Sequence, residues 1–338
     1  MPQKIIRTIC IFTGKPSEQD VARLVALEER FKSAGFAVQT RRLCSLDAQA
    51  VFDLDAALDG TVFMSLGRLN FDRASGNLDD FLAAKNVAFN VDLTDEPITL
   101  DHAGLLFEII ARNAGKTFSF AYTFNTPPSS PFFPSADYAQ DGVAIGLQPT
   151  DLSAGAGSIE AWLERVRETW FEINAMLAGE AGYLGIDTSI APLFDGPGSL
   201  LKIVTDTGLI FDEAVTSDAF MRISRFIKSE GPRNTGLCGL MFPCLEDFEL
   251  AREYEAGNFP IERNLFLSLH SGLGIDAYPI GVDERPERVV QILNLIQALS
   301  NRYAKPLSVR FVSDGKARIG ERSEFDNPYL KDIVIHPL

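Results

Sequence analysis

The fold is decided near the start of the chain by the segment IIRTICIFTGKPSEQDVARLVALEERFKSAGFAVQTRRL, residues 5–43. An apolar run opens this segment, and Ser17 then provides a residue type suited to cap a helix. The next apolar residues recur with helical spacing: Val21, Leu24, Leu27 and Phe31. Gly35 ends the helix, and FAVQTRRL, residues 36–43, returns as a second strand. The order strand, helix, strand predicts two parallel strands joined by a crossover helix.

The same alternation continues along the rest of the chain. Further strand-like segments are predicted at residues 61–67, 87–93, 118–124, 142–148, 183–189, 236–242, 274–280, 307–312 and 332–336. Helical stripes between them consist of Trp162, Val166, Trp170, Ile173 and Leu177, and of Val289, Ile292, Leu293, Ile296 and Leu299. About ten strands alternating with helices, without a linker of low complexity, predict a single α/β domain over residues 1–338.

The charge of the chain argues against two classes of partner. The chain contains 31 Lys and Arg against 46 Asp and Glu, which gives a net charge of −15. Such a surface repels nucleic-acid backbones and anionic lipids, so we expect no nucleic acid and no membrane as partners. No apolar run approaches the roughly 20 residues that span a bilayer.

The cysteines and the first residues of the chain indicate the cellular compartment of the protein. Four cysteines in 338 residues are too few for a disulfide framework, and the last two lack zinc-site spacing. Residues 1–14 lack a full signal-peptide core and a cleavage site, so they are interpreted as leading into the first strand. We therefore expect reduced thiols in a cytoplasmic protein.

Two carboxylates are the first candidates for a functional site. The tetrapeptide Leu-Gly-Ile-Asp occurs twice, and each copy sets an Asp, Asp187 or Asp276, into a short apolar run. Polar residues at the carboxyl ends of parallel strands converge on the active sites of α/β proteins, which predicts both carboxylates in one cleft. The alternative is that each Asp caps a following turn or helix.

Two arginines within apolar strands form the complementary candidates. Arg310 lies between Val309 and Phe311, and Arg7 lies in the first strand. A buried arginine must be paired or must bind an anion. Either arginine could hold an anionic substrate, or could form a structural ion pair with Asp187 or Asp276.

His270 and Ser271 stand next to a glycine-rich turn. A histidine beside flexible glycines and an Asp suits acid or base catalysis, while the alternative is a hydrogen-bonded core histidine. The sequence contains no serine-nucleophile elbow, no glycine-rich nucleotide loop and no recognised metal-ligand spacing. It therefore leaves both cofactor and metal undetermined.

The segment FNTPPSSPFFPSADY, residues 124–138, is rich in proline and predicts a stiff, largely non-helical loop. Asn125 stands at the end of the preceding strand, where its amide could hold a polar ligand. The alternative is a rigid lid or a subunit contact made by Phe132 and Phe133, which should be largely covered.

At this loop the sequence resembles a known family. The blocks FNTPPSSPFFPSADY, GIDTSIAP, FPCLEDFELAREYEAG, HSGLGIDAYPIGVD and KPLSVRFVSDGKARIGERSEFDNPYL are similar, in this order, to those of the family of unknown function numbered 711. With IRTICIF they cover nearly the whole chain. The resemblance implies a ten-stranded α/β barrel like those of pyruvate formate-lyase and ribonucleotide reductase, with a loop entering the barrel, and a homodimer.

The resemblance brings no established activity with it. Many members of the family have Cys where this chain has Ser271, which argues against covalent cysteine or thiol-radical chemistry here. Gly315 and Gly320 do not stand in a glycyl-radical motif, so radical chemistry is not expected.

Two functions remain as hypotheses. The first is an enzyme acting on a small polar or anionic metabolite at the barrel mouth. Arg310 and Arg7 would hold the anion, and Asp187 and Asp276 would manage protons or a metal, with His270 as acid or base. Asn125, Ser189 and Ser271 would orient the substrate. The second is a non-catalytic metabolite-binding or assembly protein that retains the barrel fold.

Overall fold

The structure is a computed structural model, and it describes residues 2–338. The chain has a mixed α/β fold, and its strands belong to a nine-stranded sheet. The strands are β1 Ile5–Phe12, β2 Ala37–Cys44, β3 Phe63–Leu69, β4 Val87–Asp92, β5 Phe120–Phe124, β6 Gly142–Leu147, β7 Tyr183–Asp187, β8 Gly274–Pro279 and β9 Leu307–Val312.

The helices alternate with these strands as the sequence predicts. They are α1 Glu18–Ser33, α2 Ala48–Ala57, α3 Phe71–Gly76, α4 Leu78–Ala83, α5 Leu100–Asn113, α6 Ile159–Leu177, α7 Leu200–Thr205, α8 Phe211–Val215, α9 Ala219–Ser229, α10 Phe248–Glu255, α11 Ile261–His270 and α12 Pro286–Tyr303. Three short 3₁₀ helices are η1 Ala114–Ser119, η2 Thr150–Ser153 and η3 Gly196–Gly198. Within residues 2–338, every helix is too short or too polar to cross a membrane.

The chain divides into two compact units, and each is built from three separate segments. The first unit consists of Met1–Asn90, Pro127–Ile190 and Ile223–Gly239. The second consists of Val91–Thr126, Ala191–Arg222 and Leu240–Leu338. The single domain over residues 1–338 therefore stays a prediction, and the two units are described in turn.

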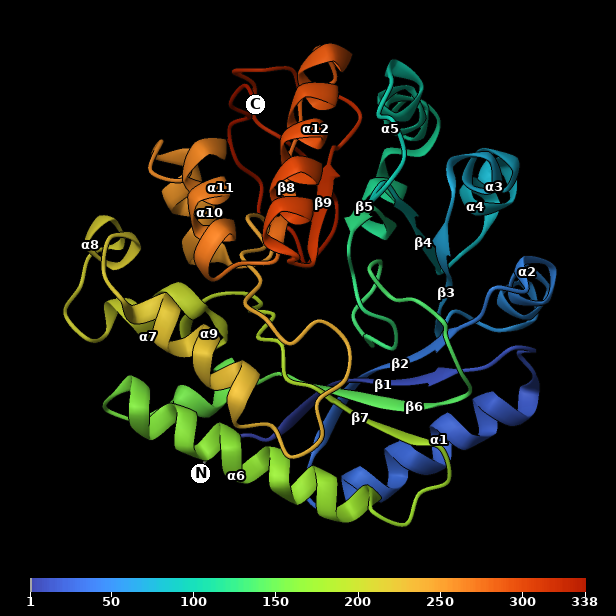
Figure 1. Cartoon of the computed structure of the whole chain (residues 1–338), viewed down its shortest axis with the longest axis vertical. Coiled ribbons are helices and arrows are strands. Elements are labelled where there is room, and N and C mark those ends of the chain that lie inside the picture. Colours follow the sequence, from blue (N-terminus) through green and yellow to red (C-terminus); the bar gives the residue numbers. More distant parts are fainter. Residues whose placement is uncertain (1) are drawn as a thin grey trace. The chain divides into compact units, whose positions relative to one another are not determined.

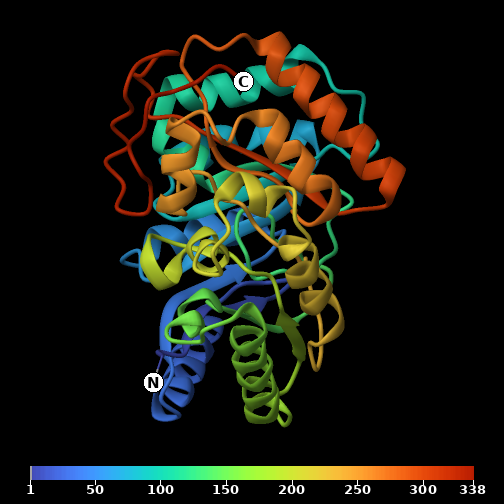
Figure 2. The same cartoon turned by 90° about the vertical axis from the view of Figure 1, so that its left-hand side faces the viewer.

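In the first unit the predicted strand–helix–strand segment is confirmed. β1 and β2 pair in parallel, with Ile5 opposite Ala37. α1 follows Ser17, whose N–H and hydroxyl both donate to the Asp20 carboxylate, at 2.9 and 2.8 Å. This capping box satisfies groups that a helix start would otherwise leave exposed. Leu24, Leu27 and Phe31 bury one face of α1, and Figures 1 and 2 show α1 and α6 side by side against the strands of this unit.

The remaining strands of the first unit extend from β1 in both directions. β6 pairs antiparallel to β1, and β7 pairs in parallel with β6 after the α6 crossover. On the other side, β3 pairs in parallel with β2. The predicted stripe on α6 is buried throughout: Trp162, Val166, Trp170, Ile173 and Leu177.

Residues 127–138 of the proline-rich loop belong to the first unit and pack against its strands. Phe132 is buried, and a Cβ on Gly146 of β6 would lie 2.8 Å from its ring. Phe133 is half-buried and packs against the cluster Cys10, Phe12, Cys44, Ala136 and Ala144. Phe132 is therefore covered, as predicted, and residues of the same chain cover it. Gly146 leaves room for the Phe132 ring because it has no side chain.

Three polar side chains tie this loop to the strands. Arg42 donates to the Pro131 carbonyl at 3.1 Å, and Arg68 forms an ion pair with Asp137. The buried Asn90 amide donates to the carbonyls of Pro134 and Ala136, both at 2.8 Å. Backbone groups of a buried loop need such partners, so these contacts explain how an irregular segment can pack inside the unit.

In the second unit, β5 pairs antiparallel with β9, and β8 pairs in parallel with β9. α5 and α12 pack against each other, and α12 also contacts β5 and β9 (Figures 1 and 2). The predicted stripe of α12 is buried at Val289, Ile292, Leu293 and Ile296. Leu299, near the end of that helix, is half-buried.

Two predicted strands do not form. Residues 236–242 contribute only an isolated bridge between Leu240 and Gly272, because Gly236 and Cys238 adopt left-handed backbone angles of φ 72° and 46°. Residues 332–336 form only a bridge between Val334 and Arg322. The sheet therefore has nine strands, in the order β7-β6-β1-β2-β3-β4-β5-β9-β8, where about ten were predicted, and this order does not close on itself.

Candidate functional site

Asp187 ends β7 and is completely buried in the first unit. Its carboxylate accepts five hydrogen bonds: from the Ser130 hydroxyl at 2.7 Å, the Ser189 N–H and hydroxyl at 3.0 and 2.6 Å, the Leu237 N–H at 2.9 Å and the Cys238 N–H at 3.0 Å. A buried carboxylate requires such compensation for its lost hydration. Asp187 thus joins the end of β7, the proline-rich loop and the turn at residues 236–239.

The geometry of that turn depends on glycine. Gly236 has φ 72°, and a Cβ there would lie 2.4 Å from the Asp187 Oδ2 atom. The Gly239 N–H donates to the Ser189 hydroxyl at 3.1 Å, which adds a second layer of contacts. Burial, with a smaller contribution from the charge of Asp187, raises the pKa of the Cys238 thiol to about 12. Cys238 is therefore a neutral thiol at pH 7 and a weak nucleophile.

Arg310 and Asp276 meet in the second unit. The Arg310 guanidinium donates to Asp276 Oδ1 at 2.7 Å and to Glu246 Oε1 at 2.6 Å. It also donates to the Phe118 carbonyl at 3.3 Å and lies 4.9 Å from the centre of the Phe118 ring. The structural ion pair named as the alternative from sequence is therefore present for Asp276, with Glu246 as an additional partner.

The electrostatics of Arg310 follow from this arrangement. Burial lowers the pKa of its guanidinium, but the charges of Asp276 and Glu246 outweigh burial and raise the pKa above its usual value. Sequence reasoning missed Glu246, which is buried beside Arg310 although it stands 64 positions earlier in the chain. The apolar residues that flank it, in PCLEDF, were the one signal that this carboxylate is buried.

His270 and Ser271 are brought together where α11 ends. The Ser271 Oγ atom lies 2.7 Å from His270 Nδ1. Ser271 is buried and His270 is half-buried, with the Phe266 ring packed edge-on against the imidazole at 4.9 Å. Burial, and then the charge of Lys305, lower the pKa of His270 below its usual value. The imidazole is therefore neutral at pH 7 and can accept the serine proton.

The other two predicted ligands of an anion or polar substrate have local partners. Asn125 has φ 51°, and its side-chain amide donates to Asn301 at 2.7 Å and to Ser300 at 3.0 Å, on α12. It thus ties the end of β5 to that helix. Arg7 lies in the first unit and donates to Gln39 on β2 at 3.1 Å.

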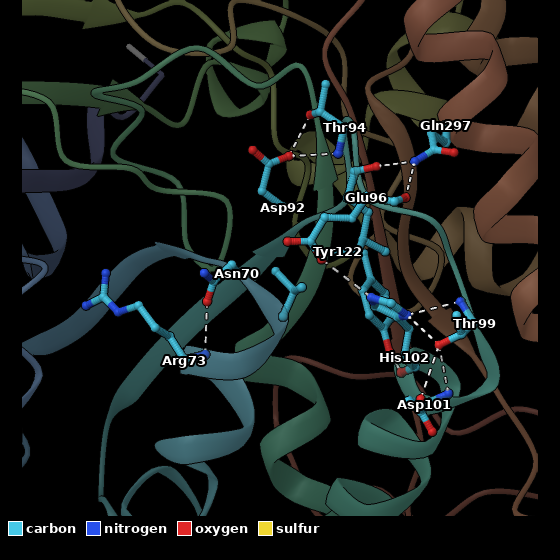
Figure 3. Close-up of polar contacts among 12 residues, drawn as sticks. Asn70, Arg73, Asp92, Thr94, Glu96, Thr99, Asp101, His102, Tyr122 and Gln297 are labelled. Atoms are coloured by element: carbon cyan, nitrogen blue, oxygen red, sulfur yellow. Dashed lines mark hydrogen bonds and ion pairs between the residues drawn. The ribbon is translucent and has the colours of Figure 1, made fainter.

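Sequence reasoning missed a buried histidine in the second unit (Figure 3). His102, in the first turn of α5, accepts the Thr99 N–H through Nδ1 at 3.1 Å, and its Nε2 lies 3.6 Å from Glu96. The Tyr122 hydroxyl donates to the His102 carbonyl at 2.5 Å. The spacing Thr-x-x-His was the available signal, but Glu or Gln is the usual partner in a capping box. These contacts cap and anchor α5.

Figure 3 also shows how the segment after β4 is held. Thr94 donates to Asp92 through its N–H at 3.0 Å and its hydroxyl at 2.5 Å. Gln297 of α12 donates to the Glu96 carbonyl at 2.8 Å. Among residues 2–338, no group of three or more His, Cys, Asp and Glu side chains is arranged to hold a metal ion.

The structure thus brings six of the predicted site residues together in three pairs: Asp187 with Ser189, Arg310 with Asp276, and His270 with Ser271. The first pair lies in one unit and the other two lie in the second unit. The meeting of Asp187 and Asp276 in one cleft stays a prediction.

The fold and these buried polar clusters define an α/β protein with candidate sites in each unit. Residues 83–326 match the family described as Uncharacterised ACR (DUF711), so the chain belongs to this family, as its sequence blocks indicated. It is 24% identical over 247 residues to a UPF0210 protein of Pyrobaculum arsenaticum (strain DSM 13514 / JCM 11321 / PZ6). That match covers 64% of this chain and 54% of the relative, so the chain spans about half the length of the curated relative.

Proposed function

We propose that this chain is an enzyme acting on a small polar or anionic metabolite, with Ser271 as nucleophile and His270 as base. The observation that carries the proposal is the 2.7 Å contact between Ser271 Oγ and His270 Nδ1. A serine hydroxyl is a weak nucleophile by itself, and an adjacent neutral imidazole activates it by taking its proton. The lowered pKa of His270 supports a neutral imidazole at pH 7.

The chemistry that suits this pair is acyl transfer to water. As Ser271 Oγ bonds to a substrate carbonyl carbon, its proton passes to His270 Nδ1. The imidazolium then returns that proton to the leaving group as the bond to it breaks, which leaves an acyl-serine. Water attacks the acyl-serine with His270 again as the base, and the carboxylic acid and free serine are released.

Lys305 is the candidate that replaces Arg310 as the group attracting an anion. Arg310 already contacts two carboxylates, so its charge is offset. Lys305 is half-buried, its charge acts on His270, and its ammonium donates to the Ser268 carbonyl at 2.5 Å. A cation beside the reacting pair suits a substrate that carries a carboxylate or phosphate.

We also propose that the chain forms the ten-stranded barrel, with residues 234–244 at the position of the tenth strand. In the first unit, this segment bridges to β7 between Asn234 and Ile186, and the Ile190 N–H donates to Gly239 at 3.0 Å. In the second unit it bridges to β8 between Pro243 and Asp276. The proposed homodimer is tested separately, by measuring the mass of the chain in solution.

The test of the enzyme is reaction with a fluorophosphonate, which modifies activated serines, together with a screen of carboxylic esters and a thermal-shift screen of metabolites. We expect labelling at Ser271 and a loss of about 10²-fold or more in rate for Ser271→Ala and for His270→Gln. Ser268→Ala is the matched control, because Ser268 is a buried neighbour whose hydroxyl donates to the Asn264 carbonyl at 2.8 Å. Labelling that persists in Ser271→Ala would contradict the proposal.

The second candidate is a non-catalytic metabolite-binding protein. The observation that favours it is the full hydrogen-bonding of Asp187, whose carboxylate accepts five hydrogen bonds from groups of its own chain. A metabolite that raises the melting temperature, with no labelling of Ser271 and no ester turnover, would select this candidate.

A further inference from the structure

Four buried side-chain polar atoms in the first unit have no hydrogen-bond partner among residues 2–338: Thr8 Oγ1, Gln148 Oε1, Trp170 Nε1 and the Tyr183 hydroxyl. Two of them come from neighbouring strands, the Thr8 Oγ1 atom of β1 and the Gln148 Oε1 atom just after β6, on side chains that are 0% and 1% exposed. A buried polar atom without a partner is unfavourable, because it has lost its hydration and gained no hydrogen bond in return. Native proteins leave few such atoms, and each one calls for an explanation.

The strand register places these two residues on the same face. Thr8 pairs with Gly146 across the β1–β6 ladder, and Gln148 stands two residues beyond Gly146. The register of the ladder shifts by one residue between Ile6 and Thr8, and beyond this shift the Gln148 N–H donates to the Ile5 carbonyl at 2.8 Å, so the two strands stay paired up to Gln148. Alternate residues of a strand share a face, so Gln148 follows Gly146 on the side of Thr8.

The surroundings of this pair are polar on one side and aromatic on the other. The Gln148 side-chain amide donates to the buried Thr150 hydroxyl at 2.8 Å. A Cβ on Gly146 would meet the Phe132 ring at 2.8 Å and the Thr8 methyl at 3.0 Å. The Phe132 ring thus lies beside Thr8 over Gly146, and Asp187 is opposite Gly146 on β7.

We propose that Thr8 and Gln148 form a buried binding site for one small neutral molecule that carries hydroxyl groups. The Thr8 hydroxyl can both donate and accept. The Thr150 hydroxyl can also do either, so Gln148 can present its oxygen or its amino group to a ligand. A hydroxyl group, which donates and accepts, satisfies both residues in either arrangement. A charged ligand would lose its hydration there and would need a paired charge.

This site lies in the first unit and is independent of the enzyme proposed for Ser271 and His270. Glycerol is the probe, and its binding to the full chain is measured by saturation-transfer NMR. We expect glycerol to bind the wild-type chain and to bind at least tenfold more weakly to Thr8→Val and to Gln148→Met. Thr8→Ser, which keeps the hydroxyl, should retain binding.

The matched control is Thr188→Val. Thr188 is a buried threonine of the same unit whose hydroxyl donates to the Ile227 carbonyl at 2.9 Å. Thr188→Val should lower the melting temperature and keep glycerol binding. Thr8→Val should instead melt at or above the wild-type temperature, because it removes a hydroxyl that has no protein partner.

Crystals grown with and without glycerol complete the test. Density for glycerol within hydrogen-bonding distance of both Thr8 Oγ1 and Gln148 Oε1 is the expected result. The proposal is overturned by a single ordered water at these atoms in both crystals, or by glycerol seen in the crystal with no binding in solution, an adventitious additive only. Unchanged glycerol binding by both Thr8→Val and Gln148→Met, or loss of melting temperature in Thr8→Val as large as in Thr188→Val, also overturns it.

Discussion

The guanidinium of Arg310 lies 2.7 Å from Asp276, and the same buried cation lies 2.6 Å from Glu246. One positive charge therefore holds two carboxylates within the second unit. Each member of this group depends on the others, because an unpaired buried charge is costly while the complete group is compensated. The arrangement accounts for an arginine in the middle of a buried strand.

Arg310→Met should lower the free energy of unfolding by about 3–5 kcal/mol, since it leaves two carboxylates without their cation. Urea unfolding followed by circular dichroism measures the change. Arg302→Met is the control, because Arg302 is exposed at the end of α12. If the two variants were equally stable, Arg310 would not be a structural residue, and the hypothesis that it binds an anionic substrate would be favoured instead.

Asp247 should make the stability of the chain depend on pH. Its buried carboxylate caps α7 through the Leu200 N–H at 3.0 Å and caps α10 through the Glu249 N–H at 3.2 Å. Burial raises its pKa to about 6, whereas an Asp in an unfolded chain has a pKa of about 3.9. The folded chain therefore binds this proton more tightly than the unfolded chain.

The sign of the pH effect follows from that difference. The contribution of Asp247 to the free energy of unfolding should be fully present below the pKa of the unfolded chain. It should be lost as the pH rises through the pKa of the folded chain, and the total loss should be about 3 kcal/mol. Asp247→Asn has no group that titrates there, so its stability should depend less steeply on pH between about 4 and 6. The prediction would be refuted if the free energy of unfolding of both chains changed with pH by the same amount across this window.

The reaction of Ser271 with a fluorophosphonate should depend on the protonation of His270. Because burial and Lys305 lower the pKa of His270, the rate should fall only when the pH drops below the usual histidine range. Lys305→Met removes one of the two causes, so the midpoint of the pH profile should move upward, toward about 6.5. A midpoint that is identical in both chains would show that Lys305 does not act on the reacting imidazole.

The proline-rich loop should contribute to stability through Phe132. Phe132→Ser removes a buried ring that packs over Gly146 and should cost about 3–5 kcal/mol in thermal or urea unfolding. Phe171→Ser is the matched control, because the Phe171 ring is 53% exposed on α6. If Phe132→Ser were as stable as the control, the loop would not form part of the core of the first unit.

Local sequence features predicted much of the secondary structure correctly. The strand–helix–strand segment at residues 5–43 was readable because helical spacing, a capping residue and a terminating glycine all act within a few positions. Residues 236–242 were misread, because their apolar composition suits a strand while Gly236 and Cys238 take left-handed angles. Those angles serve contacts with Asp187, which stands about 50 positions away.

The sequence by itself determined which polar residues are unusual: Asp187, Asp276 and Arg310 each interrupt an apolar run, and a polar group in such a place requires a partner. Only the tertiary structure decided which residues pair with these polar groups. Ser130 reaches Asp187 across 57 positions, and Glu246 reaches Arg310 across 64. Periodicity reports the faces of a single helix or strand, whereas hydrogen bonds and ion pairs depend on which faces the folded chain brings within about 3 Å of each other.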